Sequence, residues 1–414
     1  MSVFLFRDVC KCYIQLPLFR MMILFFMVIL YGMPSSAGEG VFVTGNDALQ
    51  LGRCGSGVAS PRSSYWSFMN PAGMVDVERR LDLNFYTVYD KVTYKPHGVF
   101  ANKVDGDLIS SELNAVVSTG IIWPLETGTL GGGIFVPSGN SIEYPHSRNI
   151  VTRLFQGNGD RRLGYQHLRG VLAYAYEFDN GWALGFGLHV SLSRFRSDHL
   201  TLKLRPAEYD NEWDDAYGAG FGVGVYRKWD KFAVGINYNP RHWVQSMTKY
   251  RDLLANTLDS PQFIQAGIAY KVTPKVELTL DYRWSDWSSV KAYGAPIFDG
   301  GGFGWKDQHG VKMGIEWVAH PRWTFMGGYS YSNTPITEEN VFLATLVPVV
   351  LEHTFAAGVS HKINEKHEIH LIGAWAIPNT MYDTGRGDLF SKLGKESSLR
   401  SDACSVMIGY SYLW

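Results

Sequence analysis

Residues 276–284 read Val276-Glu-Leu-Thr-Leu-Asp-Tyr-Arg-Trp284, in which apolar and polar side chains alternate at every position. Successive side chains of a strand point to opposite faces, so this stretch has one apolar face and one face that carries Glu277, Asp281 and Arg283. The same alternation recurs at residues 182–193, 232–238 and 406–414. Such strands lie either between lipid and a polar lumen or between the core of a soluble sheet and water.

The lengths of the connections distinguish these two fold classes. We expect strands at 81–95, 110–123, 128–137, 165–179, 181–198, 217–229, 231–238, 261–272, 275–285, 307–319, 322–331, 351–362, 366–377 and 402–414. The connections between them alternate between short ones with turn residues, such as Thr273-Pro274, and loops of about 20 residues. Tight turns at one rim and long loops at the other are typical of outer-membrane barrels. The sequence therefore predicts an all-β, transmembrane antiparallel β-barrel of about 14 strands, counted from Leu81 to Trp414.

The first 37 residues have the features of a signal peptide. Arg20 precedes an apolar run from Met21 to Met33, and Ser35-Ser36-Ala37 is a small-residue pattern that a signal peptidase accepts. The run is too short to span a bilayer as a helix, although an uncleaved N-terminal anchor is the alternative. Because the region before the run is long, Met21 or Met22 is a candidate start in place of Met1.

The composition excludes several classes of protein. No stretch of 18 or more apolar residues follows the leader, which argues against helical membrane spans. A formal net charge of −1 gives no electrostatic basis for binding nucleic acid. Cys10 and Cys12 lie in the leader, so only Cys54 and Cys404 remain; we expect two free, buried thiols, with one disulfide as the alternative.

Residues 38–80 precede the first expected strand and do not alternate. They are rich in small residues up to Gly57 and continue as Ser63-Ser-Tyr-Trp-Ser-Phe-Met-Asn-Pro-Ala-Gly73. A segment of about 40 residues is too short to hold a core of its own. It is therefore either disordered or packed inside the barrel.

The stretch Tyr65-Trp-Ser-Phe-Met-Asn70-Pro71-Ala72-Gly73 resembles the hatch motif of the FadL-like outer-membrane transporters of long-chain fatty acids and aromatic hydrocarbons. The resemblance continues through Phe135-Val-Pro-Ser-Gly139, Asp281-Tyr-Arg-Trp-Ser-Asp-Trp287, Lys306-Asp-Gln-His-Gly310 and Gly328-Tyr-Ser-Tyr-Ser-Asn-Thr-Pro335. It covers nearly all of the mature chain in order. It implies a hatch at residues 38–80, with Asn70, Pro71, Ala72 and Gly73 as its motif, inside a barrel that spans residues 81–414.

The resemblance also implies a function in the bacterial outer membrane. A hydrophobic compound would be captured among extracellular loops, move to a pocket in the lumen and leave sideways where the third strand kinks. That strand contains Gly131, Gly132, Gly133 and Pro137, residues that weaken a ladder, although an ordinary bulge or strand end is an equal alternative. The implied partners are a hydrophobic ligand, membrane lipid with lipopolysaccharide and the barrel-assembly machinery, with a monomeric barrel and no cofactor.

Two features depart from the family. The chain ends in Trp414 where phenylalanine is usual, which bears on how the assembly machinery recognises the barrel. The loop at residues 138–164 and its surroundings are basic, with Arg148, Arg153, Arg161, Arg162 and Arg169. These arginines suit a carboxylate headgroup or lipopolysaccharide phosphates, and a solvated charged loop is the other interpretation.

Other motifs support no catalytic chemistry. The glycines of Gly218-Ala-Gly-Phe-Gly-Val-Gly224 fall at intervals of two with no helix after them, so we interpret them as small residues that leave room in the lumen or for the hatch. Glu277, Asp281 and Arg283 are interpreted as a lumen ion-pair network that holds the hatch rather than an acid/base site. His367 and His370 point to opposite faces of a strand and cannot share a metal.

The stretch Val341-Phe-Leu-Ala-Thr-Leu-Val-Pro-Val-Val-Leu351 falls in a long loop, and we expect exposed apolar surface there that binds a ligand, or a continuation of the strand. Transport of hydrophobic compounds is the function that the whole pattern favours. The alternatives are a general diffusion porin, a structural or adhesive barrel, and an outer-membrane hydrolase.

Overall fold

A computed structural model describes residues 39–414, apart from 102–105, 145–160, 199–211, 251–253 and 255. The predicted leader, with Cys10, Cys12 and the three candidate start methionines, lies outside the described residues. Arg148 and Arg153 also lie outside them, as does the side chain of Arg161.

The chain forms one closed antiparallel sheet, in which each long strand pairs with its sequence neighbours and β1 pairs with β15. The predicted barrel of 14 strands is confirmed, with the two-residue β8 in addition. The strands are β1 (Arg80–Lys95), β2 (Leu108–Leu125), β3 (Gly128–Tyr144), β4 (Arg161–Glu177), β5 (Trp182–Asp198), β6 (Asp214–Lys228), β7 (Phe232–Asn239), β8 (Trp243–Val244), β9 (Phe263–Thr273), β10 (Val276–Ser285), β11 (Gln308–His320), β12 (Trp323–Ser332), β13 (His353–Asn364), β14 (His367–Tyr382) and β15 (Ser398–Leu413).

Several strands extend beyond their predicted ends on the side of the long loops. β3 continues to Tyr144 although we expected its end at residue 137, and β14 continues to Tyr382. The backbone ladder persists there after the apolar alternation has ended, so the pattern alone could not show it. β8 was not predicted: Pro240 lacks the amide donor that would continue β7, and the wall resumes where Trp243 and Val244 pair with β6.

The two faces of the wall differ as the alternation predicted. On β5 the side chain of Val190 is 66% exposed on the outer face, whereas its neighbours His189 and Ser191 are buried in the lumen. On β10, Leu280 and Tyr282 face outward and Asp281 is 1% exposed. An apolar outer surface of this extent is stable only against lipid.

Both remaining cysteines are free thiols, but only one of them is buried. Cys54 lies inside the barrel, where burial raises the pKa of its thiol to about 12. The prediction of two buried thiols is wrong for Cys404, which occupies an outward position of β15 and is exposed on the outer face of the wall.

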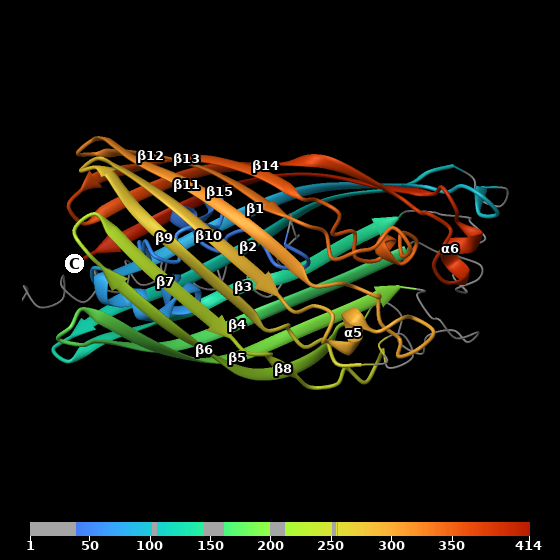
Figure 1. Cartoon of the computed structure of the whole chain (residues 1–414), viewed down its shortest axis with the longest axis horizontal. Coiled ribbons are helices and arrows are strands. Elements are labelled where there is room, and N and C mark those ends of the chain that lie inside the picture. The colour runs from blue at the N-terminus through green and yellow to red at the C-terminus, as the bar shows by residue number, and fades with distance from the viewer. Residues whose placement is uncertain (1–38, 102–105, 145–160, 199–211, 251–253, 255) are drawn as a thin grey trace, which may run out of the picture.

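The two rims of the barrel differ in their connections. The short turns lie at the end that holds the C-terminus, and the long loops with α5 (Lys291–Gly294), η3 (Leu343–Thr345) and α6 (Leu389–Leu393) lie at the other end (Figure 1). In the turn before β5, Gly181 has a φ of 76°, a backbone conformation that glycine adopts without strain. None of the helices in the described ranges is long and apolar enough to cross a membrane.

The segment before β1, residues 39–79, lies inside the barrel and is called the hatch below. It contains the short helices α2 (Ala48–Leu51), α3 (Trp66–Met69) and η1 (Pro71–Asp76), drawn in blue in Figure 1. Nearly all of its side chains are buried, and its aromatic residues share one apolar cluster with inward residues of the wall. The sequence left two alternatives open for this segment, disorder or packing in the lumen. In the structure the segment packs in the lumen.

Candidate functional site

The hatch is held to the wall by a carboxylate of β10. One carboxylate oxygen of Asp281 accepts hydrogen bonds from the backbone N–H groups of Gly57 and Val58, each at 2.9 Å, and from the amide of Gln265 at 2.7 Å. The two successive N–H groups point toward one acceptor because Gly57 has a φ of 105°, which favours glycine. A charged acceptor shared by several buried donors holds the hatch loop in one position.

Two charged residues of the hatch form further ion pairs with the same part of the wall. Arg62 lies 2.8 Å from Glu277 on β10 and 3.2 Å from Glu316 on β11. Glu39 pairs with Arg283 at 3.0 Å and with Lys312. Glu277, Asp281 and Arg283, which share the inward face of one strand, therefore each contact a different part of the hatch.

On the opposite side the hatch meets β1. The carboxylate of Asp82 accepts a hydrogen bond from the backbone N–H of Ser64 at 2.7 Å and pairs with Arg80 at 2.8 Å. Asp47 caps α2 by accepting from the backbone N–H of Leu49. Burial, together with the nearby Asp82 carboxylate, raises the pKa of Asp47 to about 6.

In the motif Asn70-Pro71-Ala72-Gly73, Asn70 links α3 to η1 and the other three residues form the first turn of η1. The Asn70 amide donates to Val58 O in the hatch at 3.0 Å and to Val225 O on β6 at 3.2 Å. Gly185 and Gly224 face this turn from β5 and β6, and a Cβ at either position would overlap atoms of Asn70, Pro71 or Ala72. Of the glycine stripe of β6, Gly224 thus leaves room for the hatch, whereas Gly218 and Gly220 leave room for His242. Gly185 on β5 has the same role as Gly224, which the glycine pattern of β6 alone does not indicate.

The wall is discontinuous between β2 and β3. These strands pair only from Thr119 with Ile134 to Leu125 with Gly128. Beyond this point the edge of β3 is occupied by the hatch: Val43 N donates to Pro137 O at 3.0 Å, and Gly139 N donates to Val41 O at 3.1 Å. A segment of the hatch therefore takes the place of a neighbouring strand at this break.

Asn46 of the hatch contacts both sides of the break. Its side-chain oxygen accepts from Val136 N on β3 at 2.9 Å, and its backbone oxygen accepts from the Ser118 hydroxyl on β2. Farther along, Glu143 N on β3 donates to the Ser110 hydroxyl on β2 at 3.0 Å. The unpaired stretch is thus bounded at both ends and is filled by the hatch.

The three glycines of the third strand lie just before the break. Gly131, Gly132 and Gly133 are paired on both sides, with β2 and with β4. Pro137 lies within the register shift of the β3–β4 ladder, between Phe135 and Ser138. The part that these residues play in a lateral exit stays a prediction.

At the other end of the lumen, residues 341–351 close the mouth of the barrel. The expectation of exposed apolar surface is wrong here, because nearly all of these side chains are buried. Tyr144 donates to Thr345 O at 2.9 Å, and Asn379 donates to Val350 O at 2.8 Å. The alternative of strand continuation is also wrong, because the segment forms η3 and a loop that folds into the mouth.

Aromatic rings form a contact chain from the surface to this buried loop. Phe298, 63% exposed, stacks on Phe390 of α6 with ring centroids 5.4 Å apart. Phe390 lies 5.1 Å from Phe342, which in turn lies 5.2 Å from Phe100 and 6.2 Å from Tyr94. The rings thus form a continuous series of aromatic contacts from the exposed Phe298 to the buried Tyr94.

A polar cluster lies in the middle of the lumen around Arg169 of β4, which is 1% exposed. Its guanidinium lies 3.0 Å from His167 Nε2 and 3.2 Å from the Ser260 hydroxyl, and it faces the ring of Phe68 at 5.2 Å. Its Nε has no hydrogen-bond partner among the described residues, and Nδ1 of the neighbouring His242 has none either. The described part of the chain places no carboxylate within ion-pair distance of this arginine.

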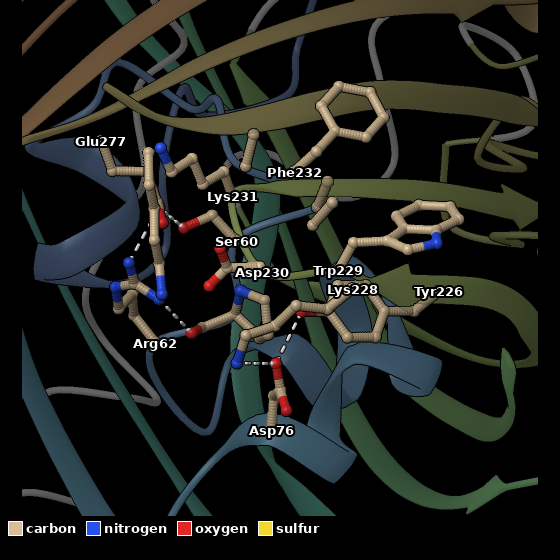
Figure 2. Close-up of a pocket in the computed structure, with 15 residues that line it drawn as sticks. Ser60, Arg62, Asp76, Tyr226, Lys228, Trp229, Asp230, Lys231, Phe232 and Glu277 are labelled. Atoms are coloured by element: carbon tan, nitrogen blue, oxygen red, sulfur yellow. Dashed lines mark hydrogen bonds and ion pairs between the residues drawn. The ribbon is translucent and has the colours of Figure 1, made fainter. Parts of the chain in front are cut away.

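Figure 2 shows a cavity between the hatch and the wall at the rim of short turns. Ser60, Arg62 and Glu277 line one side of it, and on the other Asp76 pairs with Lys228 at 2.7 Å. Its volume is about 60 Å³, which suits about two water molecules. The charged lining and the small volume exclude this cavity as the binding site of a hydrophobic ligand.

The described histidines do not form a metal site. His367 contacts the Tyr410 hydroxyl at 2.6 Å, whereas His370 is buried on the inner face between Ser360 and Ser411. Within the described ranges, no three His, Cys, Asp or Glu residues are arranged to hold a metal ion.

Comparisons with known proteins give one family. The model of a family described as outer membrane protein transport protein (OMPP1/FadL/TodX) matches residues 32–372. A Pseudomonas aeruginosa FadL homologue has the same fold, with 13% sequence identity, a TM-score of 0.66, and coverage of 90% of this chain and 99% of that chain. The P. putida toluene transporter TodX has 14% identity and a TM-score of 0.67, with 91% of this chain and 99% of that chain covered. The Ralstonia pickettii toluene transporter TbuX has 14% identity and a TM-score of 0.64, with 90% of this chain and 99% of that chain covered. No curated protein sequence matches the chain.

We expect the substitution Asp281→Ala to loosen the hatch without unfolding the barrel. It leaves the buried backbone N–H groups of Gly57 and Val58 without an acceptor, and each loss costs about 1–3 kcal/mol. Protease cleavage within residues 39–79 of the folded barrel should accelerate at least about tenfold, since 1.4 kcal/mol is a factor of ten. Asp299→Ala, which removes an exposed loop carboxylate, is the control and should leave cleavage unchanged. Equal cleavage of both variants would contradict the role of Asp281 in holding the hatch.

Proposed function

Because the chain belongs to the family of outer membrane transport proteins OMPP1/FadL/TodX, it is a transporter of hydrophobic compounds in the bacterial outer membrane, and we propose the route that such a compound takes. The family is one of transporters, which favours transport over a general diffusion porin, an adhesive barrel or a hydrolase. We also propose that the protein acts as a monomer, since one chain supplies both the closed barrel and its hatch. Lipopolysaccharide and the barrel-assembly machinery are its expected partners in the membrane.

The proposed route begins at the aromatic chain of the mouth. The exposed ring of Phe298 offers a first contact, and Phe390 and Phe342 lead to the buried loop at residues 341–351. Apolar area that passes from water to such rings gains about 25 cal/mol per Å². The gain draws the solute from the polar surface of the outer leaflet into the barrel.

We propose that the compound leaves through the break between β2 and β3, and this break is the observation that carries the proposal. The hatch segment at Val41, Val43 and Asn46 fills the opening and satisfies the backbone groups at its edge. When that segment moves, the apolar lumen connects sideways with the hydrocarbon of the bilayer. Gly131, Gly132, Gly133 and Pro137 belong to the strand that borders this exit.

The cluster around Arg169 favours a hydrophobic acid over a hydrocarbon as the transported compound. A buried guanidinium without a carboxylate partner is costly unless a ligand supplies the negative charge. Phe68 of the hatch covers the guanidinium, so the site becomes accessible when the hatch shifts. Two of the solved relatives are toluene transporters, which makes an aromatic hydrocarbon the second candidate.

A disulfide between the hatch and β3 should stop transport. Phe42 and Ser138 are bridge partners, and the separation of such Cα atoms, about 4.5–5.5 Å, lies within the disulfide range. The test variant carries Phe42→Cys and Ser138→Cys in a background in which Cys54 and Cys404 are replaced by serine. When the pair is oxidised, uptake of a labelled fatty acid should fall at least about fivefold, because the disulfide fixes the hatch segment to β3. A reductant should restore uptake, because it breaks this one bond.

The matched control joins two strands that are already paired. Ala356→Cys and Ala374→Cys connect β13 to β14 in the intact wall, and their oxidation should leave uptake unchanged. If the oxidised Phe42→Cys/Ser138→Cys variant took up the fatty acid as fast as the reduced variant, the result would contradict the proposed lateral exit.

The ligand class is tested with Arg169→Met and Arg169→Lys. A hydrogen bond to a charged group contributes about 1.5–3 kcal/mol, so the methionine variant should bind a long-chain fatty acid about 10-fold to 100-fold more weakly than the parent protein. Binding of the methyl ester of the same acid, which lacks the charge, should change less than about threefold. The lysine variant should recover part of the affinity for the acid, and an equal loss for acid and ester would contradict a headgroup site.

A further inference from the structure

Two arginines at the rim of short turns lie over tryptophan rings on the outer face of the barrel. Arg79, immediately before β1, lies 3.1 Å from the ring centroid of Trp123 on β2 and 4.8 Å from that of Trp414 at the end of β15. The two indoles lie edge to face, with centroids 5.9 Å apart. One guanidinium thus joins the three chain segments at the seam where the barrel closes.

The same arrangement occurs a second time. Arg227 on β6 lies 5.3 Å from the ring centroid of Trp182 on β5 and 4.7 Å from that of Trp229 in the following turn. These two indoles also lie edge to face, at 6.3 Å. Two places that share neither strands nor residues therefore hold an arginine between two tryptophans.

Neither guanidinium is neutralised within the described part of the chain. No described carboxylate lies within ion-pair distance of Arg79 or Arg227, and Nε of Arg79 is buried without a hydrogen-bond partner. The adjacent Arg80, which points into the lumen, differs: it pairs with Asp82 at 2.8 Å and bonds to Ser411. Rings satisfy the charge only in part, because they cannot accept from the five N–H donors of a guanidinium.

The depth of both arginines matches that of lipid headgroups, and Arg227 is aligned with Trp182 one step outside the outward pair Leu184 and Val225. Arg79 is aligned with Trp123 and Trp414, and the outward residues two positions farther into the wall, Ile121 and Tyr412, begin the apolar band. Two residues of a strand tilted by about 40° correspond to about 5 Å along the membrane normal. Tryptophan rings prefer this interface level, where the phosphates of the leaflet lie.

We propose that Arg79 and Arg227 form two binding sites for the phosphate of glycerophospholipids in the periplasmic leaflet. Each guanidinium lies within 5.3 Å of two tryptophan rings, and its N–H groups are donors that can bind two phosphate oxygens. The sites lie at either side of the wall section from β2 to β5, which contains the break between β2 and β3. Bound lipids would fix the periplasmic ends of the two strand groups that border the break. This inference stands apart from the transported compound.

The test uses the folded protein in detergent and native mass spectrometry with two one-chain lipids, lysophosphatidylglycerol and a monoacylglycerol of the same chain, which lacks the phosphate. We expect the parent protein to retain two lysophosphatidylglycerol molecules at least about tenfold more strongly than the monoacylglycerol. Arg79→Gln should retain one, Arg227→Gln should retain one, and the double variant should retain none above the monoacylglycerol background.

Arg322→Gln is the matched control, because Arg322 is an exposed arginine of the β11–β12 turn at the same rim without a tryptophan pair. It should retain both lipids, and heat-dependent migration of the barrel on a gel reports that every variant is folded. Equal retention of the two lipids by the parent protein, or unchanged retention in the double variant, would overturn the proposal. Displacement of the lipid by millimolar inorganic phosphate would also overturn it, since the site would then be one for free phosphate.

Discussion

The structure depends on one constraint: no backbone N–H or C=O group of a wall in lipid can remain without a partner. A closed ladder of strands satisfies this constraint along most of the described wall, but between β2 and β3 the pairing ends at Thr119 and Ile134. There the hatch supplies the partners, with Val41 and Val43 along the edge of β3 and Asn46 between the two strands. The hatch is therefore part of the wall as well as a plug in the lumen.

This double role connects the plug to the exit. The hatch reaches the break only because the opposite wall holds it, through Asp281 at Gly57 and Val58 and through Arg283 and Lys312 at Glu39. An apolar solute gains nothing from a water-filled pore, whereas a dry lumen with a side opening delivers it directly to hydrocarbon. A barrel whose lumen holds the hatch and whose break between β2 and β3 is sealed by the same hatch suits such a solute.

The barrel could be predicted from the sequence because lipid imposes a period of two on each strand. Residues 276–284 show that period, and the structure has Leu280 and Tyr282 outside and Asp281 inside. The alternation of short and long connections predicted the two rims, because successive connections of an antiparallel barrel lie at opposite ends. β8 and the extension of β3 to Tyr144 carry no such signal, since the ladder there depends on neighbouring strands and not on lipid.

The sites could be predicted only where they follow from the strand pattern. Glu277, Asp281 and Arg283 share one face, so a common inward role was visible in the sequence, but their individual hatch partners were not. Residues 341–351 are an apolar stretch in a long loop, so the sequence indicated an exposed apolar surface. The segment is instead buried, with contacts to Tyr144 and Asn379, which are distant in the sequence. In the sequence Arg169 lies close to a basic loop and was interpreted as part of it. Its position in the lumen beside Phe68 and His167 follows from the folded structure.

The most direct measurement combines ion flux and lipid delivery in one preparation. The purified protein is placed in vesicles whose outer leaflet carries lipopolysaccharide, and a fluorescent hydrophobic acid is added outside. The account predicts that the acid reaches the bilayer faster in proportion to the amount of protein, while the vesicles stay closed to potassium and chloride. Ion leakage that rises with the amount of protein, or delivery no faster than in protein-free vesicles, would contradict a dry barrel with a side exit.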